Sequence, residues 1–292
     1  MNRPTVGFIG TGRAGTALAC ALSSARYPVV AGWSRSTPAL DRFTSVAPGA
    51  RRCERPADVL ENAELVFLTV PDSLIEVLAQ SLPWDAGWTA VHCSGALSLD
   101  VLAAAAAEGA AIGSFHPLLP LASANVDLAG AAAAIEGDEH ALPLLNEVAA
   151  ALGMHPIHLH RGEKPLYHAA ATLLSNYTVT LFDLAGRSLE QLGLSEAEAR
   201  RSLLPLLRGV VANLEHSDPG VALTGPISRG DVETVRGHIR VLSEHDPSVL
   251  EAYRALGLRT VALARRASAI DEDKAIELEE VLTADQKEEV PA

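Results

Sequence analysis

The first half of the chain alternates short apolar runs with longer segments of helical periodicity. Segments rich in Ala and Leu separate the apolar runs from one another. Seven runs have the length and composition of buried strands, at residues 6–9, 28–33, 65–70, 89–93, 111–115, 132–136 and 155–159. This alternation predicts parallel β-α-β units in a doubly wound sheet, with helices covering both faces.

From Arg161 onward only helical periodicity remains. Ser195 is followed three residues later by Glu198, which is the capping-box pattern of a helix N-terminus, and Gly193 suits the end of the preceding helix. Residues 276–282 also have helical spacing. The second half of the chain is therefore predicted to be all-helical.

The turn after the first apolar run has the spacing G-x-G-x-x-G. Gly10 permits a tight turn, Gly12 lets the backbone approach a pyrophosphate, and Gly15 lets the helix pack closely on the strand. Unpaired N–H groups of the following helix would bind the phosphates, although an ordinary glycine-rich turn is the alternative. The predicted dinucleotide contacts are Gly10, Thr11, Gly12, Arg13, Ala14 and Gly15.

The second apolar run ends at Ser34, Arg35 and Ser36, where an NAD enzyme carries an Asp or Glu for the ribose hydroxyls. A guanidinium flanked by two hydroxyls suits a 2'-phosphate instead, because Arg binds phosphate through paired charge-assisted hydrogen bonds. We therefore expect NADP(H) as the cofactor. The alternative is that these three residues form a solvated loop.

These patterns together predict an α/β fold with an N-terminal doubly wound Rossmann domain and a C-terminal all-α domain. We place the NADP-binding domain at residues 1–160 and the all-helical substrate domain at residues 161–285. Residues 286–292 are predicted to form a disordered acidic tail.

Charge and composition narrow the class of partner. A net charge of −13 over 292 residues argues against nucleic acid and anionic membranes, which both bind basic patches. The first strand follows the first residues directly, which leaves no room for a signal peptide, and no apolar run reaches membrane-spanning length. We therefore expect a cytoplasmic protein that acts on a small molecule.

Patterns for metal binding and nucleophilic catalysis are weak or missing. Cys20, Cys53 and Cys93 lack C-x-x-C spacing, which argues against a disulfide framework and against zinc. Three histidines lie in residues 155–160, but a zinc site needs further ligands of suitable spacing. The G-x-S-x-G elbow of hydrolases is absent from the sequence. We expect no metal and no nucleophilic mechanism.

Ligands of doubly wound sheets bind beyond the carboxyl ends of the strands. Polar or proline-containing loops follow the third, fourth and fifth predicted strands. A single histidine in such a loop is more often structural than catalytic. The residues expected at this edge are Val70, Pro71, Ser94 and Gly95 for the nicotinamide, His116 for the substrate, and His92 beside them.

Residues 165–177 are predicted to form the first helix of the second domain, with Pro165 in its first turn. His168, Thr172 and Asn176 recur every four residues and form one polar stripe on a helix whose surface is otherwise expected to be buried. Buried polar groups need partners, and a substrate in an inter-domain cleft can supply them. Hydrogen bonding between helices within the core is the alternative.

The segment 224–231 predicts a tight loop that opens another helix. Thr224, loop N–H groups and Arg229 can hold a carboxylate, with Asp231 in the same cluster. The alternative is a structural loop in which Arg229 and Asp231 pair with each other or cap the helix. His238 shares roughly the helix face of Asp231.

Five stretches carry a resemblance to known proteins. The chain resembles oxidoreductases built like 6-phosphogluconate dehydrogenase, 3-hydroxyisobutyrate dehydrogenase and pyrroline-5-carboxylate reductase. It is more closely similar to a bacterial group with a Rossmann-like domain followed by a DUF2520 domain. The supporting stretches are residues 7–15, 92–96, 115–118, 167–177 and 223–231.

The resemblance implies a homodimer formed through the helical domains and a substrate site near the Rossmann cleft. In 3-hydroxy acid dehydrogenases the helix after a glycine-rich turn carries a catalytic Lys, with an Asn one turn later. Aligning Gly162 with that turn puts His168 at the Lys position and Thr172 near the Asn position, whereas Lys164 falls one turn too early. His168 is then expected to act as general acid or base.

These inferences predict an NADP(H)-dependent oxidoreductase. Hydride would move to or from a small carboxylate-bearing carbonyl, hydroxy acid or imine, with His168 handling the proton and Asn176 and Arg229 orienting the substrate. One alternative is a dimeric NADP(H)-binding sensor or scaffold that has lost catalysis, for which the missing Lys is the main ground. A decarboxylating hydroxy acid dehydrogenase is a third reading.

Overall fold

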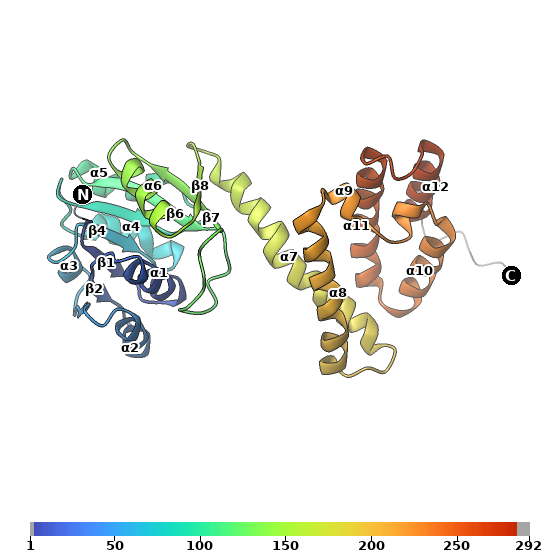
Figure 1. Ribbon diagram of the computed structural model, residues 1–292, viewed down its shortest axis with the longest axis horizontal. Coiled ribbons are helices and arrows are strands. Elements are labelled where there is room, and N and C mark those ends of the chain that lie inside the picture. The colour runs from blue at the N-terminus through green and yellow to red at the C-terminus, as the bar shows by residue number, and fades with distance from the viewer. Residues whose placement is uncertain (1–2, 285–292) are drawn as a thin grey trace. The chain divides into compact units, whose positions relative to one another are not determined.

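The computed structural model describes residues 3–284, and the chain divides into two compact units (Figure 1). Unit 1 is Met1–Asn176 and unit 2 is Tyr177–Ala292. The predicted tail at 286–292 lies outside the described residues. The division between the units falls inside one long helix, whereas the composition of the chain placed the domain boundary at the start of that helix.

Unit 1 is built on one eight-stranded sheet of order β3-β2-β1-β4-β5-β6-β7-β8. All seven predicted strands are present. The short β3 was not predicted, because its two residues are exposed and charged and pair only at the sheet edge. The strands are β1 (Val6–Ile9), β2 (Val29–Trp33), β3 (Arg51–Arg52), β4 (Leu65–Leu68), β5 (Thr89–His92), β6 (Ala111–Pro117), β7 (Ala132–Gly137) and β8 (His155–His158).

The sheet is parallel except at one position: β7 runs antiparallel to β6. No helix lies between these two strands, so the chain returns without the crossover that a parallel neighbour requires. The antiparallel register sets Glu136 directly opposite Ser114, and the parallel register of β5 sets His92 beside the same serine.

Side chains of successive strand residues enter two separate hydrophobic cores. Phe8 of β1 stacks on Phe67 of β4 at 5.3 Å between ring centroids, in the core on one face. Ile9 and Leu68 point into the core on the other face. The helices of unit 1 are α1 (Arg13–Ser24), α2 (Thr37–Val46), α3 (Ala57–Leu60), α4 (Asp72–Ser81), the 3₁₀ turn η1 (Leu99–Leu102), α5 (Ala103–Ala107) and α6 (Ala141–Ala151).

Both faces of the sheet are therefore covered by helices, as a doubly wound fold requires. Residues of α1, α2 and α6 enter the first core, and residues of α3, α4 and α5 enter the second. The three cysteines are free thiols, of which Cys53 is buried and Cys20 and Cys93 are half-buried.

Unit 2 is helical throughout its described part. Helix α7 (Lys164–Glu190) begins in unit 1 and continues beyond the predicted end at Tyr177. The capping box at Ser195 is confirmed at the start of α8. The other elements are α8 (Glu196–His216), α9 (Pro219–Ala222), η2 (Ile227–Arg229), α10 (Val232–His245), α11 (Pro247–Arg266) and α12 (Glu272–Thr283).

The predicted fold class is thus confirmed: a doubly wound α/β domain followed by a helical region. Val235, Val261 and Leu278 form the buried core of α10, α11 and α12. Within residues 3–284, no helix has both the length and the apolar composition needed to span a membrane.

Candidate functional site

Three glycines shape the turn between β1 and α1, each in different surroundings. Gly10 has a φ of +103°, and a Cβ there would lie 2.6 Å from the Thr69 carbonyl oxygen. A Cβ on Gly15 would collide with the Gly10 carbonyl. At Gly12, no atom of the described residues lies within 4 Å of an added Cβ. Folding therefore requires Gly10 and Gly15, whereas Gly12 leaves space for a ligand.

The N-terminus of α1 has unused hydrogen-bond donors beside this space. No side chain among the described residues caps α1, and its first turn contains no acidic residue. Thr11 Oγ1 is buried without a hydrogen-bond partner in residues 3–284, and Arg13 is exposed. Free N–H groups, a helix dipole and an unpaired hydroxyl suit a pyrophosphate. The residues present therefore fit the phosphates of a dinucleotide.

The residues predicted to read the 2'-phosphate lie between β2 and α2. Ser36 is the N-cap of α2, where its hydroxyl accepts a hydrogen bond from the Ala39 N–H at 3.4 Å. Ser34 Oγ accepts from the Ser36 N–H at 3.2 Å. Both hydroxyls keep their own hydrogen for donation, and the Arg35 side chain is exposed beside the helix N-terminus. This arrangement fits an anion.

The loops after β4 and β5 meet beside the glycine turn. Val70 Cγ1 would lie 2.9 Å from a Cβ on Gly10, so Val70 contacts that turn, and Pro71 is the N-cap of α4. The Ser94 hydroxyl donates to an Asp72 carboxylate oxygen at 2.8 Å and accepts two backbone N–H groups. The Ser94 side chain therefore holds the loop in shape, and the Ser94 N–H donates to His92 Nδ1 at 3.2 Å.

Lys164 is the residue that sequence reasoning did not select. It is the first residue of α7, yet only 2% of it is exposed. Its Nζ donates to the Ser94 carbonyl at 2.8 Å and to the Ser114 hydroxyl. A lysine is almost never fully buried unless its ammonium is paired or used. Lys164 thus brings an amine to the carboxyl ends of β5 and β6.

Burial lowers the pKa of Lys164 to about 8, while the carboxylate of Glu136 raises it and limits the fall. Burial is also the first cause that lowers the pKa of His116 to about 4 and the pKa of His92 to about 3, with the charge of Lys164 second. Both imidazoles are therefore neutral at pH 7. Lys164, in contrast, remains mostly protonated at that pH and can donate a proton.

His116 and His168 converge on Gly95. A Cβ on Gly95 would lie 2.9 Å from His116 Nε2 and 3.0 Å from His168 Nδ1, and the two rings lie edge-to-face with centroids 6.5 Å apart. His116 Nδ1 also lies 2.7 Å from the Tyr167 hydroxyl. In the tautomer with hydrogen on Nε2, Tyr167 donates to Nδ1 and the Nε2–H points toward Gly95. Only glycine permits this convergence.

The thiol in the same loop is not a nucleophile. Burial raises the pKa of Cys93 to about 12, even though the nearby charge of Lys164 opposes the rise. A thiol with this pKa carries almost no thiolate at neutral pH.

Thr172 and Asn176 follow His168 on the same face of α7, at intervals of one and two turns. Thr172 is half-buried and Asn176 is exposed. The expectation that the rest of this helix is buried does not hold for the single chain, because Leu166 is 79% exposed and Leu174 is 76% exposed. Of this stripe, His168 is the residue that lies against His116 and Gly95.

The remaining predicted substrate residues lie in unit 2. Asp231 caps α10, accepting from the Thr234 N–H at 3.1 Å and from its hydroxyl at 2.7 Å. These hydrogen bonds are the main reason why the pKa of Asp231 is lowered, with smaller contributions from Arg229 and His238. Asp231 therefore has the capping role, whereas the side chains of Thr224 and Arg229 are exposed.

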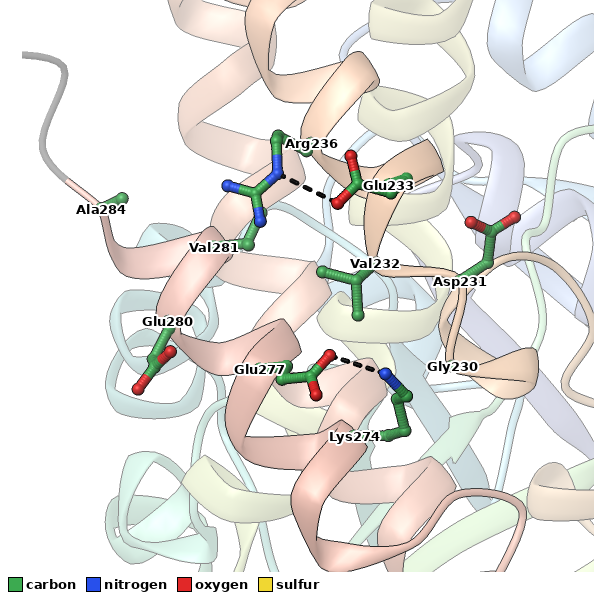
Figure 2. Close-up of a pocket in the computed structure, with 10 residues that line it drawn as sticks. All are labelled: Gly230, Asp231, Val232, Glu233, Arg236, Lys274, Glu277, Glu280, Val281 and Ala284. Carbon is green, nitrogen blue, oxygen red and sulfur yellow. Dashed lines mark hydrogen bonds and ion pairs between the residues drawn. The ribbon is translucent and has the colours of Figure 1, made fainter. Parts of the chain in front are cut away.

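Asp231 also lines a cavity of about 560 Å³ between α10 and α12, shown in Figure 2. Both cations of this cavity are already paired: Lys274 with Glu277 at 2.7 Å and Arg236 with Glu233 at 3.5 Å. Paired cations offer little to an incoming anion. We therefore do not place the chemistry in this cavity.

Across residues 3–284, no group of His, Cys, Asp and Glu side chains is arranged to hold a metal ion. Of the three clustered histidines, His158 bonds Asn146 at 2.8 Å, and His155 and His160 are exposed.

The glycine turn, the strand order and the strand-end cluster define the class of this protein as Rossmann-like, and residues 1–117 match the family model of a Rossmann-like domain. Residues 131–260 match the model described as Domain of unknown function (DUF2520). The chain therefore carries a Rossmann-like domain followed by a DUF2520 domain, which confirms the resemblance seen in the sequence. A comparison with curated protein sequences finds no match.

Several solved structures share this fold. A protein from Thermotoga maritima is 25% identical, with a TM-score of 0.73 over 89% of this chain and 99% of that chain. The Plasmodium falciparum pyrroline carboxylate reductase with NADP bound is 15% identical, with a TM-score of 0.58 over 97% and 100%. A reductive aminase from Aspergillus terreus, in complex with NADPH and ethyl-5-oxohexanoate, is 18% identical, with a TM-score of 0.59 over 96% and 92%.

Proposed function

We propose that the protein is an NADP(H)-dependent oxidoreductase that transfers hydride to or from a small carboxylate-bearing carbonyl, hydroxy acid or imine. The main support for the proposal is the position of two features of the sheet. The open space over Gly12 and the buried amine of Lys164 lie at the carboxyl ends of strands in one continuous sheet, which is where such sheets bind ligands. Solved structures of the same fold hold NADP or NADPH.

The cofactor supplies or accepts the hydride, and the chain binds it in three places. Gly12 and the free N–H groups of α1 hold the pyrophosphate. Ser34, Arg35 and Ser36 hold the 2'-phosphate. The nicotinamide lies against the residues at the next strand ends, which are Val70, Pro71, Ser94 and Gly95.

The proton is handled at the strand-end cluster. Lys164 gives a proton to the carbonyl oxygen or imine nitrogen during reduction, since it is mostly in the ammonium form at neutral pH. His116 and His168 donate hydrogen bonds that orient the substrate over Gly95. Asn176, Thr172, Thr224 and Arg229 remain proposed substrate contacts.

A catalytically inactive sensor is a weaker reading. Its main ground was the missing lysine in the helix after the glycine-rich turn, and Lys164 now supplies an amine from the first residue of that helix. The test is an NADPH-oxidation screen with 2-keto acids, cyclic imines and phosphorylated sugar acids. Turnover of one class that the Lys164→Met variant lacks supports the enzyme. NADPH binding without turnover of any class supports the sensor.

We also propose that the protein is a homodimer formed through its helical region. One face of α8 exposes a row of large apolar side chains, which soluble monomers rarely leave uncovered. The row consists of Leu206, Val210, Val211 and Leu214. Light scattering is expected to give the mass of two chains, and Leu206→Glu with Val210→Glu is expected to give one. A wild-type mass of one chain would contradict the proposal.

A further inference from the structure

A row of buried polar side chains crosses the sheet beneath Lys164. His92 of β5, Ser114 of β6 and Glu136 of β7 are register partners, so they project from the same face of neighbouring strands. Their exposed fractions are 0%, 0% and 6%. Ser114, at the centre of the row, accepts a hydrogen bond from Lys164 Nζ. Glu136 therefore lies on the side of Ser114 opposite His92, close to a buried ammonium.

Glu136 has no obvious structural task. Its Oε2 is buried without a hydrogen-bond partner in the described part of the chain. An unpaired buried carboxylate is costly, and burial does raise the pKa of Glu136, whereas the charge of Lys164 lowers it. The nearby ammonium of Lys164 therefore offsets part of the cost of burying the Glu136 carboxylate.

Glu136 also lines a cavity of about 280 Å³, together with Asp100, His160 and Arg161. Arg161 pairs with Asp100 at 3.1 Å. The charges of Asp100 and Arg161 shift the pKa of Glu136 in opposite directions, and the charge of Lys164 has a larger effect than either.

We propose that Glu136 is a positioning residue for Lys164. Its carboxylate lies one strand away, across Ser114, and supplies the opposite charge that keeps the amine protonated at neutral pH. The protonated amine favours the direction of reduction at this site. This inference rests on the proposed function, because it specifies the direction in which the same site works. An ammonium can protonate a carbonyl oxygen or imine nitrogen as hydride arrives, and a neutral amine cannot.

The other groups that face Lys164 do not replace Glu136. Cys93 remains a neutral thiol, and His92 and His116 are neutral imidazoles. Asp72 also raises the pKa of Lys164, but its carboxylate accepts the Ser94 hydroxyl, and its effect ranks below that of Glu136. Glu136 is therefore the main group that raises the pKa of Lys164 against burial.

The lysine content of the chain permits a direct test. Only three lysines occur, Lys164, Lys274 and Lys287, so ¹³Cε-labelled lysine gives three NMR signals that Lys274→Arg and Lys287→Arg assign. The Lys164 signal is followed through a pH titration in the wild-type protein and in Glu136→Gln. We expect the titration midpoint of Lys164 to fall by about one pH unit or more in the variant, as removal of a nearby opposite charge requires.

Two variants make the result specific. Glu139→Gln removes the same charge from a side chain that is 88% exposed, and it is expected to leave the midpoint unchanged. Glu136→Asp retains the charge one methylene further away and is expected to lower the midpoint by a smaller amount. If Glu136→Gln does not fold, the midpoint of Lys164 in Glu136→Asp tests the proposal in its place. A Lys164 midpoint that is the same in wild type and in every folded Glu136 variant overturns the proposal.

The readout is independent of turnover. Calorimetric titration of the same samples with NADPH reports on the proposed function, because Glu136 is not among the residues assigned to the cofactor. NADPH binding with an unmoved midpoint rejects only the role of Glu136. Absence of NADPH binding with a shifted midpoint rejects the oxidoreductase and leaves the electrostatic pairing in place.

Discussion

Replacement of Lys164 by methionine is expected to lower kcat by about 10²- to 10⁴-fold, the usual contribution of a positioned general acid. The methionine fills a similar volume but cannot donate the proton that Lys164 Nζ carries between the Ser94 carbonyl and the Ser114 hydroxyl. The measurement is steady-state NADPH oxidation with the substrate class found in the screen. NADPH affinity should change little, because Lys164 is not assigned to the cofactor.

Lys274→Met is the matched control, since it removes a lysine whose side chain is 46% exposed in unit 2. It should retain wild-type kcat. If Lys164→Met binds NADPH and also keeps full turnover, the amine is not the acid, and His168 becomes the residue to replace.

The same assignment sets the direction of the pH dependence. The pKa of Lys164, lowered to about 8, means that the ammonium form prevails below pH 8 and the neutral amine prevails above it. Reduction, which needs the ammonium, should therefore lose rate by about tenfold for each pH unit above that midpoint. Oxidation of the product, which needs the amine, should gain rate by about tenfold for each pH unit up to that midpoint and level off above it.

Gly12→Ala is expected to weaken NADPH binding by about tenfold to a hundredfold while leaving the fold intact. The Cβ would enter the open space where we place the pyrophosphate, and each charge-assisted hydrogen bond lost there is worth about 1.5–3 kcal/mol. The backbone of Gly12 is extended, with φ of −69°, which alanine adopts without strain. Calorimetric titration measures the affinity, and thermal unfolding measures the stability.

Gly15→Ala is the contrasting variant. Its Cβ would collide with the Gly10 carbonyl and approach Thr69 Oγ1, so it should lower the unfolding temperature whether or not a nucleotide is present. Equal NADPH affinity in Gly12→Ala and the wild type would show that the space over Gly12 does not receive the pyrophosphate.

Local patterns were enough to predict most of unit 1. Strands that are buried on both faces appear as continuous apolar runs, and Gly10, Gly12 and Gly15 have steric tasks that depend on their immediate neighbours. The direction of β7 could not be predicted, because the period of a strand is the same in a parallel and an antiparallel pair. The opposition of Glu136 to Ser114 therefore required the structure.

At the site itself, the role of Lys164 could not be predicted from the sequence. A lysine before Pro165 has the sequence appearance of an exposed helix start, and its burial depends on Ser94 and Ser114, which precede it by 70 and 50 residues. One sequence signal did exist: a chain with 23 Lys and Arg residues uses lysine at only three positions. Arginine cannot take the place of such a lysine, because its guanidinium stays protonated whereas the pKa of a buried lysine amine shifts readily.

The proposed oxidoreductase activity depends on NADPH binding, which calorimetric titration with NADPH and with NADH, beside the Arg35→Ala variant, measures directly. We expect NADPH to bind more tightly than NADH and Arg35→Ala to remove this preference, since the guanidinium holds the 2'-phosphate. Binding of neither nucleotide to the wild-type protein would contradict it, because the glycine turn would then be structural and the oxidoreductase assignment would have no cofactor.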